Sequence, residues 1–289
     1  MENFGVSAIH PLAPQMLSAA ALFTAPIDID AALARLASLW GVDSTPEWET
    51  VTAQNGSASG RLVHFDIQGV QVLLSGIPGR FQPERGALPE HAFYIPITLF
   101  APLTGAEHGT LAGESPFDPS RAPGLGTDPS TIPPSEWMET RRRKRMVSAH
   151  IALTQVADAL MREEAAIGLF RQELGVVQPP HMITELAQTL TQGQVPLPLW
   201  VNIRIQQPSL TVGRTLGLPL FGHLDLEVLD STHPGEDVYA ELAKVATYLI
   251  TGDSFLLPGQ TLGSAQGEPI ALTQEVSPLD QSPVIRVLY

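Results

Sequence analysis

The sequence predicts an α+β protein: a mixed, mostly antiparallel sheet with helices packed on one face, in two similar halves. Segments with strand and helical periodicity follow one another in both halves. The chain has 289 residues, 44% of them hydrophobic, which is enough for a sizeable core. Residues 101–134 are rich in Pro, Gly, Ser and Thr, which predicts a poorly packed loop. We therefore divide the chain into an N-terminal α+β half at 1–100, a Pro/Gly-rich loop and basic connector at 101–145, and a C-terminal α+β half at 146–289.

The N-terminal half begins with a strand and a capped helix. Leu17–Phe23 is an apolar run of strand length. Asp28 or Asp30 is suited to cap the helix that we predict over 28–40, and Gly41 is placed to end it.

A β-hairpin is predicted next, at 61–75. Apolar and polar residues alternate on both sides of Gly69, which is the pattern of two half-buried strands joined by a turn. A further strand is predicted at 93–100, although Pro96 removes one backbone donor from it.

The C-terminal half repeats this arrangement of strands and helices. Helical spacing of apolar residues predicts helices at 156–164, 180–191 and 235–250. Strands are predicted at 147–154, 166–170, 176–178, 199–205, 224–229, 269–275 and 284–288.

Composition excludes several classes of function. The chain has no cysteine, which rules out disulfides, thiolate metal sites and cysteine nucleophiles and suits a reducing cytoplasm. Its formal net charge is −14, so phosphate backbones and anionic lipids repel it. No segment approaches the ~18 consecutive apolar residues of a membrane span. We expect a cytoplasmic protein whose partner is another protein, with no nucleic acid and no membrane.

Familiar catalytic motifs are absent from the sequence. There is no Gly-x-Ser-x-Gly elbow, no phosphate-binding loop and no zincin helix, and no cofactor is predicted. The segment with chemical content is the predicted strand that contains His223, Asp225 and Glu227. Alternation places these three on one side, where they could hold a divalent cation or exchange protons, with His150 joining them if its strand is a neighbour. The other interpretation is a half-buried strand with a solvated outer face.

Five consecutive basic residues, Arg141–Arg145, precede the C-terminal half. They are either a patch for nucleic acid or a solvated connector that pairs with the protein's own acidic surface. We favour the second, since the surrounding negative charge opposes nucleic acid and no aromatic residues are interleaved for base stacking.

The C-terminal half contains a series of short segments that are familiar together: Ala149–Ile151, Val176–Pro180, Pro196–Trp200, Thr215–Leu218, Phe221-Gly222, Asp225–Glu227, Tyr248-Leu249 and Pro258–Gly263. In these segments the chain resembles the bacterial domain-of-unknown-function family 4261. The similarity extends over roughly 148–289, more loosely over the first hundred residues, and implies a fold and a bacterial cytoplasmic setting but no reaction.

Taken together, these features favour a non-enzymatic protein-interaction protein of immunity or adaptor type. Acidity favours fast association with a basic partner. The alternative is a metal-assisted hydrolase that uses His223, Asp225 and Glu227.

Overall fold

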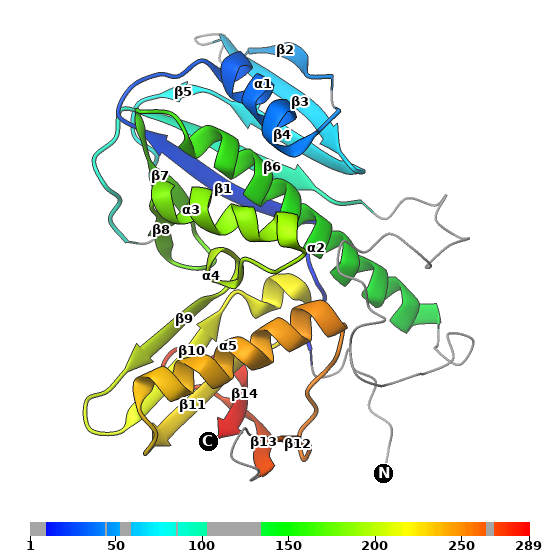
Figure 1. Ribbon diagram of the computed structural model, residues 1–289, viewed down its shortest axis with the longest axis vertical. Helices are drawn as coiled ribbons and strands as arrows, with labels where there is room; N and C mark the ends of the chain where they lie inside the picture. The colour runs from blue at the N-terminus through cyan, green and yellow to red at the C-terminus, as the bar shows by residue number, and fades with distance from the viewer. Residues whose placement is uncertain (1–9, 44, 53–58, 85, 103–133, 264–268) are drawn as a thin grey trace. The chain divides into compact units, whose positions relative to one another are not determined.

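The computed structural model describes residues 10–43, 45–52, 59–84, 86–102, 134–263 and 269–289. It confirms the α+β class, with two mostly antiparallel sheets in place of the single predicted sheet (Figure 1). The predicted loop at 101–134 lies almost wholly outside the described residues.

The described residues divide into two compact units. Unit 1 comprises 10–14, 134–144 and 200–289, and unit 2 comprises 15–102 and 145–199, within the ranges given above. Both units therefore draw on segments that are distant in sequence, whereas the division predicted from the sequence was contiguous.

Unit 2 contains a sheet with the strand order β2-β3-β4-β6-β1-β7-β8, in which every pair is antiparallel. The short strand β5 (Ile77–Pro78) pairs with β6 beside this path. The other strands are β1 (Met16–Phe23), β2 (Glu47–Thr52), β3 (Ser59–Ile67), β4 (Val70–Ser75), β6 (Phe93–Phe100), β7 (Ala166–Arg171) and β8 (Val176–Gln178).

Several predicted elements of unit 2 are confirmed. The predicted hairpin is β3–β4, and its apolar residues, among them Val63 and Val72, are buried on one side. Helix α1 (Ile29–Trp40) begins where the Asp28 carboxylate accepts a hydrogen bond from the Ala31 N–H, and it ends at Gly41 in the left-handed conformation.

The strand predicted at 147–154 is wrong, because these residues belong to helix α2 (Pro134–Met161). Buried residues recur at helical spacing along this segment, namely Met146, Ala149, Leu153 and Val156, which explains why it is a helix and not a strand. Helix α2 also contains residues 156–161 of the helix predicted at 156–164. Farther along, the helix predicted at 180–191 is α3 (Pro180–Ala187), followed by a 3₁₀ turn, η4 (Gln188–Gln192).

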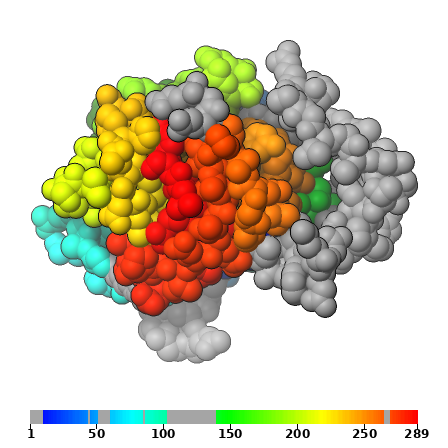
Figure 2. Space-filling model, turned by 90° about the horizontal axis from the view of Figure 1, so that it is seen from below, coloured from blue at the N-terminus to red at the C-terminus, as the bar shows by residue number. Residues whose placement is uncertain are grey.

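Unit 1 contains the second sheet, with the order β12-β13-β14-β11-β10-β9. The pair β11–β14 is parallel, and the other pairs are antiparallel. The same order is visible in Figure 2, where β14 (red) lies between β11 (yellow) and β13 (orange). The strands are β9 (Asn202–Gln206), β10 (Thr211–Leu216), β11 (Asp225–Ser231), β12 (Thr261–Gly263), β13 (Pro269–Val276) and β14 (Pro283–Leu288).

Helix α5 (Gly235–Gly252) packs against β9, β10 and β11 (Figure 1). The approach is close at Gly213 of β10, where an added Cβ would lie 2.6 Å from Val238 and 2.9 Å from Leu242.

Strand β10 is absent from the sequence-based prediction, because its Gly and Arg interrupt the apolar pattern. The strand predicted from Leu199 begins only at Asn202, since the short helix α4 (Leu197–Trp200) precedes it; another 3₁₀ turn, η5 (Leu218–Phe221), leads toward β11.

Candidate functional site

The polar strand predicted around 223–227 is the start of β11, and its polar residues lie inside unit 1. His223, Asp225 and Glu227 are 1%, 7% and 0% exposed, so the interpretation of a half-buried strand with a solvated outer face is wrong. Val228 pairs with Gly213, which faces α5, so alternation directs Leu226 toward α5 and Glu227 to the other side of the sheet.

His223 precedes β11 and belongs to an aromatic cluster with His10 and Phe255. Its ring centroid lies 5.9 Å from that of His10 and 5.0 Å from that of Phe255. The His10 Nδ1 accepts the Leu224 N–H at 3.1 Å, so its Nε2, which lies 2.9 Å from the Leu256 oxygen, carries the proton as donor.

Both histidines of this cluster are neutral at physiological pH. Burial, together with the nearby His10 and Arg143, lowers the pKa of His223 to about 3. Burial also lowers the pKa of His10, although its hydrogen bond to Leu256 opposes this shift. Arg143 lies over the Phe255 ring at 4.3 Å and donates to the Asp253 carboxylate at 2.5 Å.

Asp225 occupies a separate environment at the first residue of β11. Its Oδ1 accepts the Thr215 hydroxyl at 3.0 Å and the Leu218 N–H at 3.2 Å. Burial raises the pKa of Asp225 to about 7, although these two hydrogen bonds and the charge of Arg214 act against the rise. The carboxyl is therefore about half protonated at neutral pH.

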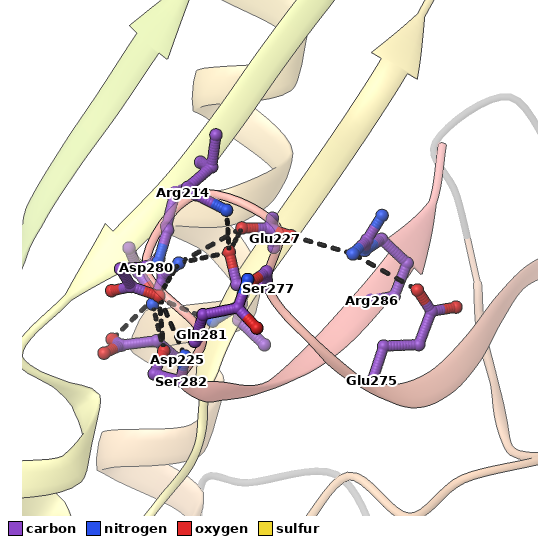
Figure 3. Close-up of polar contacts among 12 residues, drawn as sticks. Arg214, Asp225, Glu227, Glu275, Ser277, Asp280, Gln281, Ser282 and Arg286 are labelled. Carbon is purple, nitrogen blue, oxygen red and sulfur yellow. Dashed lines mark hydrogen bonds and ion pairs between the residues drawn. The ribbon is translucent and has the colours of Figure 1, made fainter.

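Glu227 is the centre of a charged network on the side of the sheet away from α5 (Figure 3). Its two carboxylate oxygens pair with Arg214 at 3.2 Å and Arg286 at 2.9 Å. Arg286 also pairs with Glu275 at 3.2 Å. Arg214, Arg286 and Glu275 come from the strands β10, β14 and β13, so the network links four strands of the sheet.

The turn between β13 and β14 completes this network. Arg214 donates to Ser277 at 2.6 Å, to Asp280 at 2.9 Å and to Ser282 at 2.6 Å. Ser277 in turn donates to Glu227 at 2.5 Å (Figure 3). Partial burial acts to raise the pKa of Asp280, but the hydrogen bonds that it accepts from Ser282 and Arg214 lower this pKa overall.

The Glu227 network is better suited to hold the strands of the sheet together than to catalyse a reaction. Each Glu227 oxygen is already paired with a guanidinium, and a carboxylate held in this way is a poor base and a poor ligand. Within the part of the chain that the structure describes, no three His, Asp or Glu residues are placed to hold a metal ion. Asp225 and Glu227 are brought close to Arg214, whereas His223 faces the aromatic cluster.

His150 lies on helix α2 of unit 2 and not on a strand. It is fully buried, and its Nδ1 lies 2.8 Å from the Met146 oxygen. Burial and the charge of Arg171 lower its pKa well below the usual value. The condition under which it was predicted to join the polar strand, a neighbouring strand position, is therefore not met.

The basic run Arg141–Arg145 is also part of α2, so its interpretation as a connector is wrong. Its central residue, Arg143, pairs with Asp253, as expected for pairing with the protein's own acidic residues. Arg145 contacts the Gln68 oxygen at 3.5 Å.

The sequence-based prediction missed most of the network. A signal was present for Arg286, a single charge within the apolar strand Val284–Leu288, because such a charge requires a buried partner. His10 carries no comparable signal, since its partner Leu224 is 214 positions away.

One of three comparisons with known proteins gives a match, and it lies in unit 1. No curated protein and no solved structure matches the chain. No helix among the described residues has the length and apolar character needed to cross a membrane. The model of the family described as "Domain of unknown function (DUF4261)" matches residues 214–288, which contain every member of the Glu227 network. The resemblance is thus confirmed over this segment: residues 214–288 match the model of the domain-of-unknown-function family 4261.

Proposed function

We propose that the chain is a non-enzymatic protein-interaction protein of immunity or adaptor type, which acts in the bacterial cytoplasm and associates with a basic partner protein. The observation that carries this proposal is the distribution of charge. Among the described residues, the buried charged groups are four arginines and four carboxylic acids. The formal charges of the buried set therefore cancel, and the formal net charge of −14 belongs to the rest of the chain.

A surplus of negative charge outside the core favours a protein partner of opposite charge. Complementary charges accelerate encounter, and they disfavour nucleic acids and anionic lipid surfaces. The polar residues that would support chemistry are enclosed, which leaves the acidic surface as the accessible feature. The alternative of a metal-assisted hydrolase has no observation in its favour, since the described carboxylates and histidines form no metal-binding group.

Cross-linking of the chain in its native host, followed by mass spectrometry of the purified adducts, tests this proposal. We expect a defined basic protein, and with the purified pair an association rate that falls steeply with salt while dissociation changes little. Failure to recover a partner, together with metal-dependent turnover of an ester or phosphoester that Glu227→Gln abolishes while the variant remains folded, would favour the hydrolase.

A further inference from the structure

The cleft beside the end of β3 in unit 2 is a concave surface outside the family segment. It encloses about 710 Å³, within the range of ligand-binding clefts. Strand β2 pairs with β3 only as far as Glu47 opposite His64, while the pairing of β3 with β4 continues to Ile67. Among the described residues, no strand pairs with Phe65–Ile67 on the side of β2, and residues 41–43 and Thr45 also line the cleft.

The lining of this cleft is acidic. Its only charged residues of fixed sign are Asp43, Glu47, Glu49 and Asp66, and no Lys or Arg is among the described residues that line it. The side chains of Glu47 and Glu49 are 73% and 62% exposed, and their interaction with His64, at 3.7 and 3.4 Å, leaves them accessible. Arg145 reaches Gln68 at the margin without lining the cleft.

Three kinds of cation differ in how well they match this surface. A metal ion would need three closely placed ligands, and the described residues offer no such group. A small polyamine would use the charges alone. A basic peptide would use the charges and also the backbone of Phe65–Ile67, which pairs with no described strand on the side of β2 and can add strand-like hydrogen bonds that only a main chain supplies.

The spacing of the acidic residues supports the peptide. Glu47 and Glu49 are two positions apart on one strand and therefore share a face, as do His64 and Asp66. An extended peptide presents every second side chain to the same surface, so alternate Lys or Arg residues would meet these carboxylates. Trp40, at the end of α1, adds an aromatic wall against which a guanidinium can stack.

We propose that this cleft binds an extended, Lys- or Arg-containing segment of the partner protein by adding it to the free edge of β3. The inference rests on the proposed interaction function and adds the site and the chemistry of the partner segment. Glu47 and Glu49 provide the electrostatic selection, and the backbone of Phe65–Ile67 provides the pairing.

Calorimetric titration of the full chain tests the proposal with three probes: a short peptide of alternating Lys and Val, the same peptide with Glu in place of Lys, and spermidine. The cleft variant is Glu47→Gln/Glu49→Gln. The matched control, Glu164→Gln/Glu185→Gln, removes the same charge from exposed positions of unit 2 outside the cleft. Both variants should keep the wild-type melting temperature, because all four side chains are exposed.

We expect the Lys peptide to bind wild type and the control alike, and to bind the cleft variant about tenfold more weakly. Hydrogen exchange should show new protection of the Phe65–Ile67 amides when the peptide is bound. The proposal is overturned if the Lys peptide does not bind, if both variants lose affinity equally, or if spermidine binds as tightly as the peptide. Because these titrations need no native partner, they fail independently of the cross-linking experiment that tests the proposed function.

Discussion

Strands β3 and β11 carry the same alternating pattern and have opposite surroundings. In β3, Val63 and Phe65 are buried, while Asp66 on the other side is exposed and His64 is half-buried. In β11, Leu226 is buried, and so is its polar neighbour Glu227. Both strands lie inside their sheets, β3 between β2 and β4 and β11 between β10 and β14. The difference arises because the turn at 277–282 covers the polar side of β11.

Alternation therefore predicts the strand and its two sides, but not what the polar side meets. On β3, the polar side meets solvent and stays available for a ligand. On β11, it meets two arginines, and its charge becomes part of the core. The same chemical substitution should thus have very different effects at the two places.

The largest effect is expected for Glu227→Gln. This variant leaves the buried Arg214 and Arg286 without their central counter-charge, which should lower the free energy of unfolding by ~3 kcal/mol. Urea denaturation monitored by circular dichroism measures the change. The matched control is Glu49→Gln on the open face, for which a change of less than ~0.5 kcal/mol is expected. Equal effects at both positions would refute the contrast.

Removing the whole charged network should cost less than removing its centre. In the triple variant Arg214→Met/Glu227→Leu/Arg286→Met, apolar side chains of similar size replace the charges. The two carboxylates that lose a partner, Glu275 and Asp280, are partly exposed, so no buried ion is left uncompensated. We expect its free energy of unfolding to return to within about 2 kcal/mol of wild type, measured by the same denaturation. A triple variant less stable than Glu227→Gln would mean that the network contributes net stability.

The dependence of stability on pH distinguishes the contributions of His223 and Asp225, which are expected to have opposite signs. His223 has a folded pKa of about 3 against an ordinary value of 6.5, so stability falls as pH decreases from 6.5. Asp225 has a folded pKa of about 7 against 3.8, so its contribution falls as pH rises between these values. The two slopes oppose each other, each by at most ~1.4 kcal/mol per pH unit.

Thermal denaturation at several pH values between about 4 and 7 resolves these contributions. Asp225→Asn keeps the oxygen that accepts from Thr215, removes the falling slope, and should make stability rise more steeply with pH. His223→Phe suits the cluster with Phe255 and should flatten the rise. Profiles that both variants leave unchanged would contradict the buried placement of these groups.

The smallest effect is expected at His64. Its interactions with Glu47 and Glu49 are exposed, so His64→Gln should change the free energy of unfolding by less than ~0.5 kcal/mol, and the melting curve should overlay that of wild type. A larger loss would show that the open face of β3 is covered in solution.

Local signals made much of the fold predictable. Asp28 and Gly41 fix the ends of α1, and the turn at Gly69 fixes the hairpin, because each acts within a few residues of sequence. The strand predicted at 147–154 failed because a short apolar run fits either period, and only the wider spacing from Met146 to Leu160 distinguishes them.

The candidate site was predictable only in part. Alternation identified Asp225 and Glu227, since they lie on one strand. Their partners could not be derived, because Arg214 and Ser277 are 63 positions apart and meet only through the register of the second sheet. Burial of a polar strand depends on such distant segments, and no property of the strand itself encodes it.

The place of β14 between β11 and β13 has a consequence for synthesis on the ribosome. The described segments of unit 2 end at residue 199, so they can fold while the remaining chain is still being made. In unit 1, β11 has only β10 beside it until residues 283–288 emerge, and Glu227 stays hydrated until Ser277 and Arg286 arrive. Completion of that sheet is therefore a late event, and until then the edge of β11 is open to mispairing with other strands.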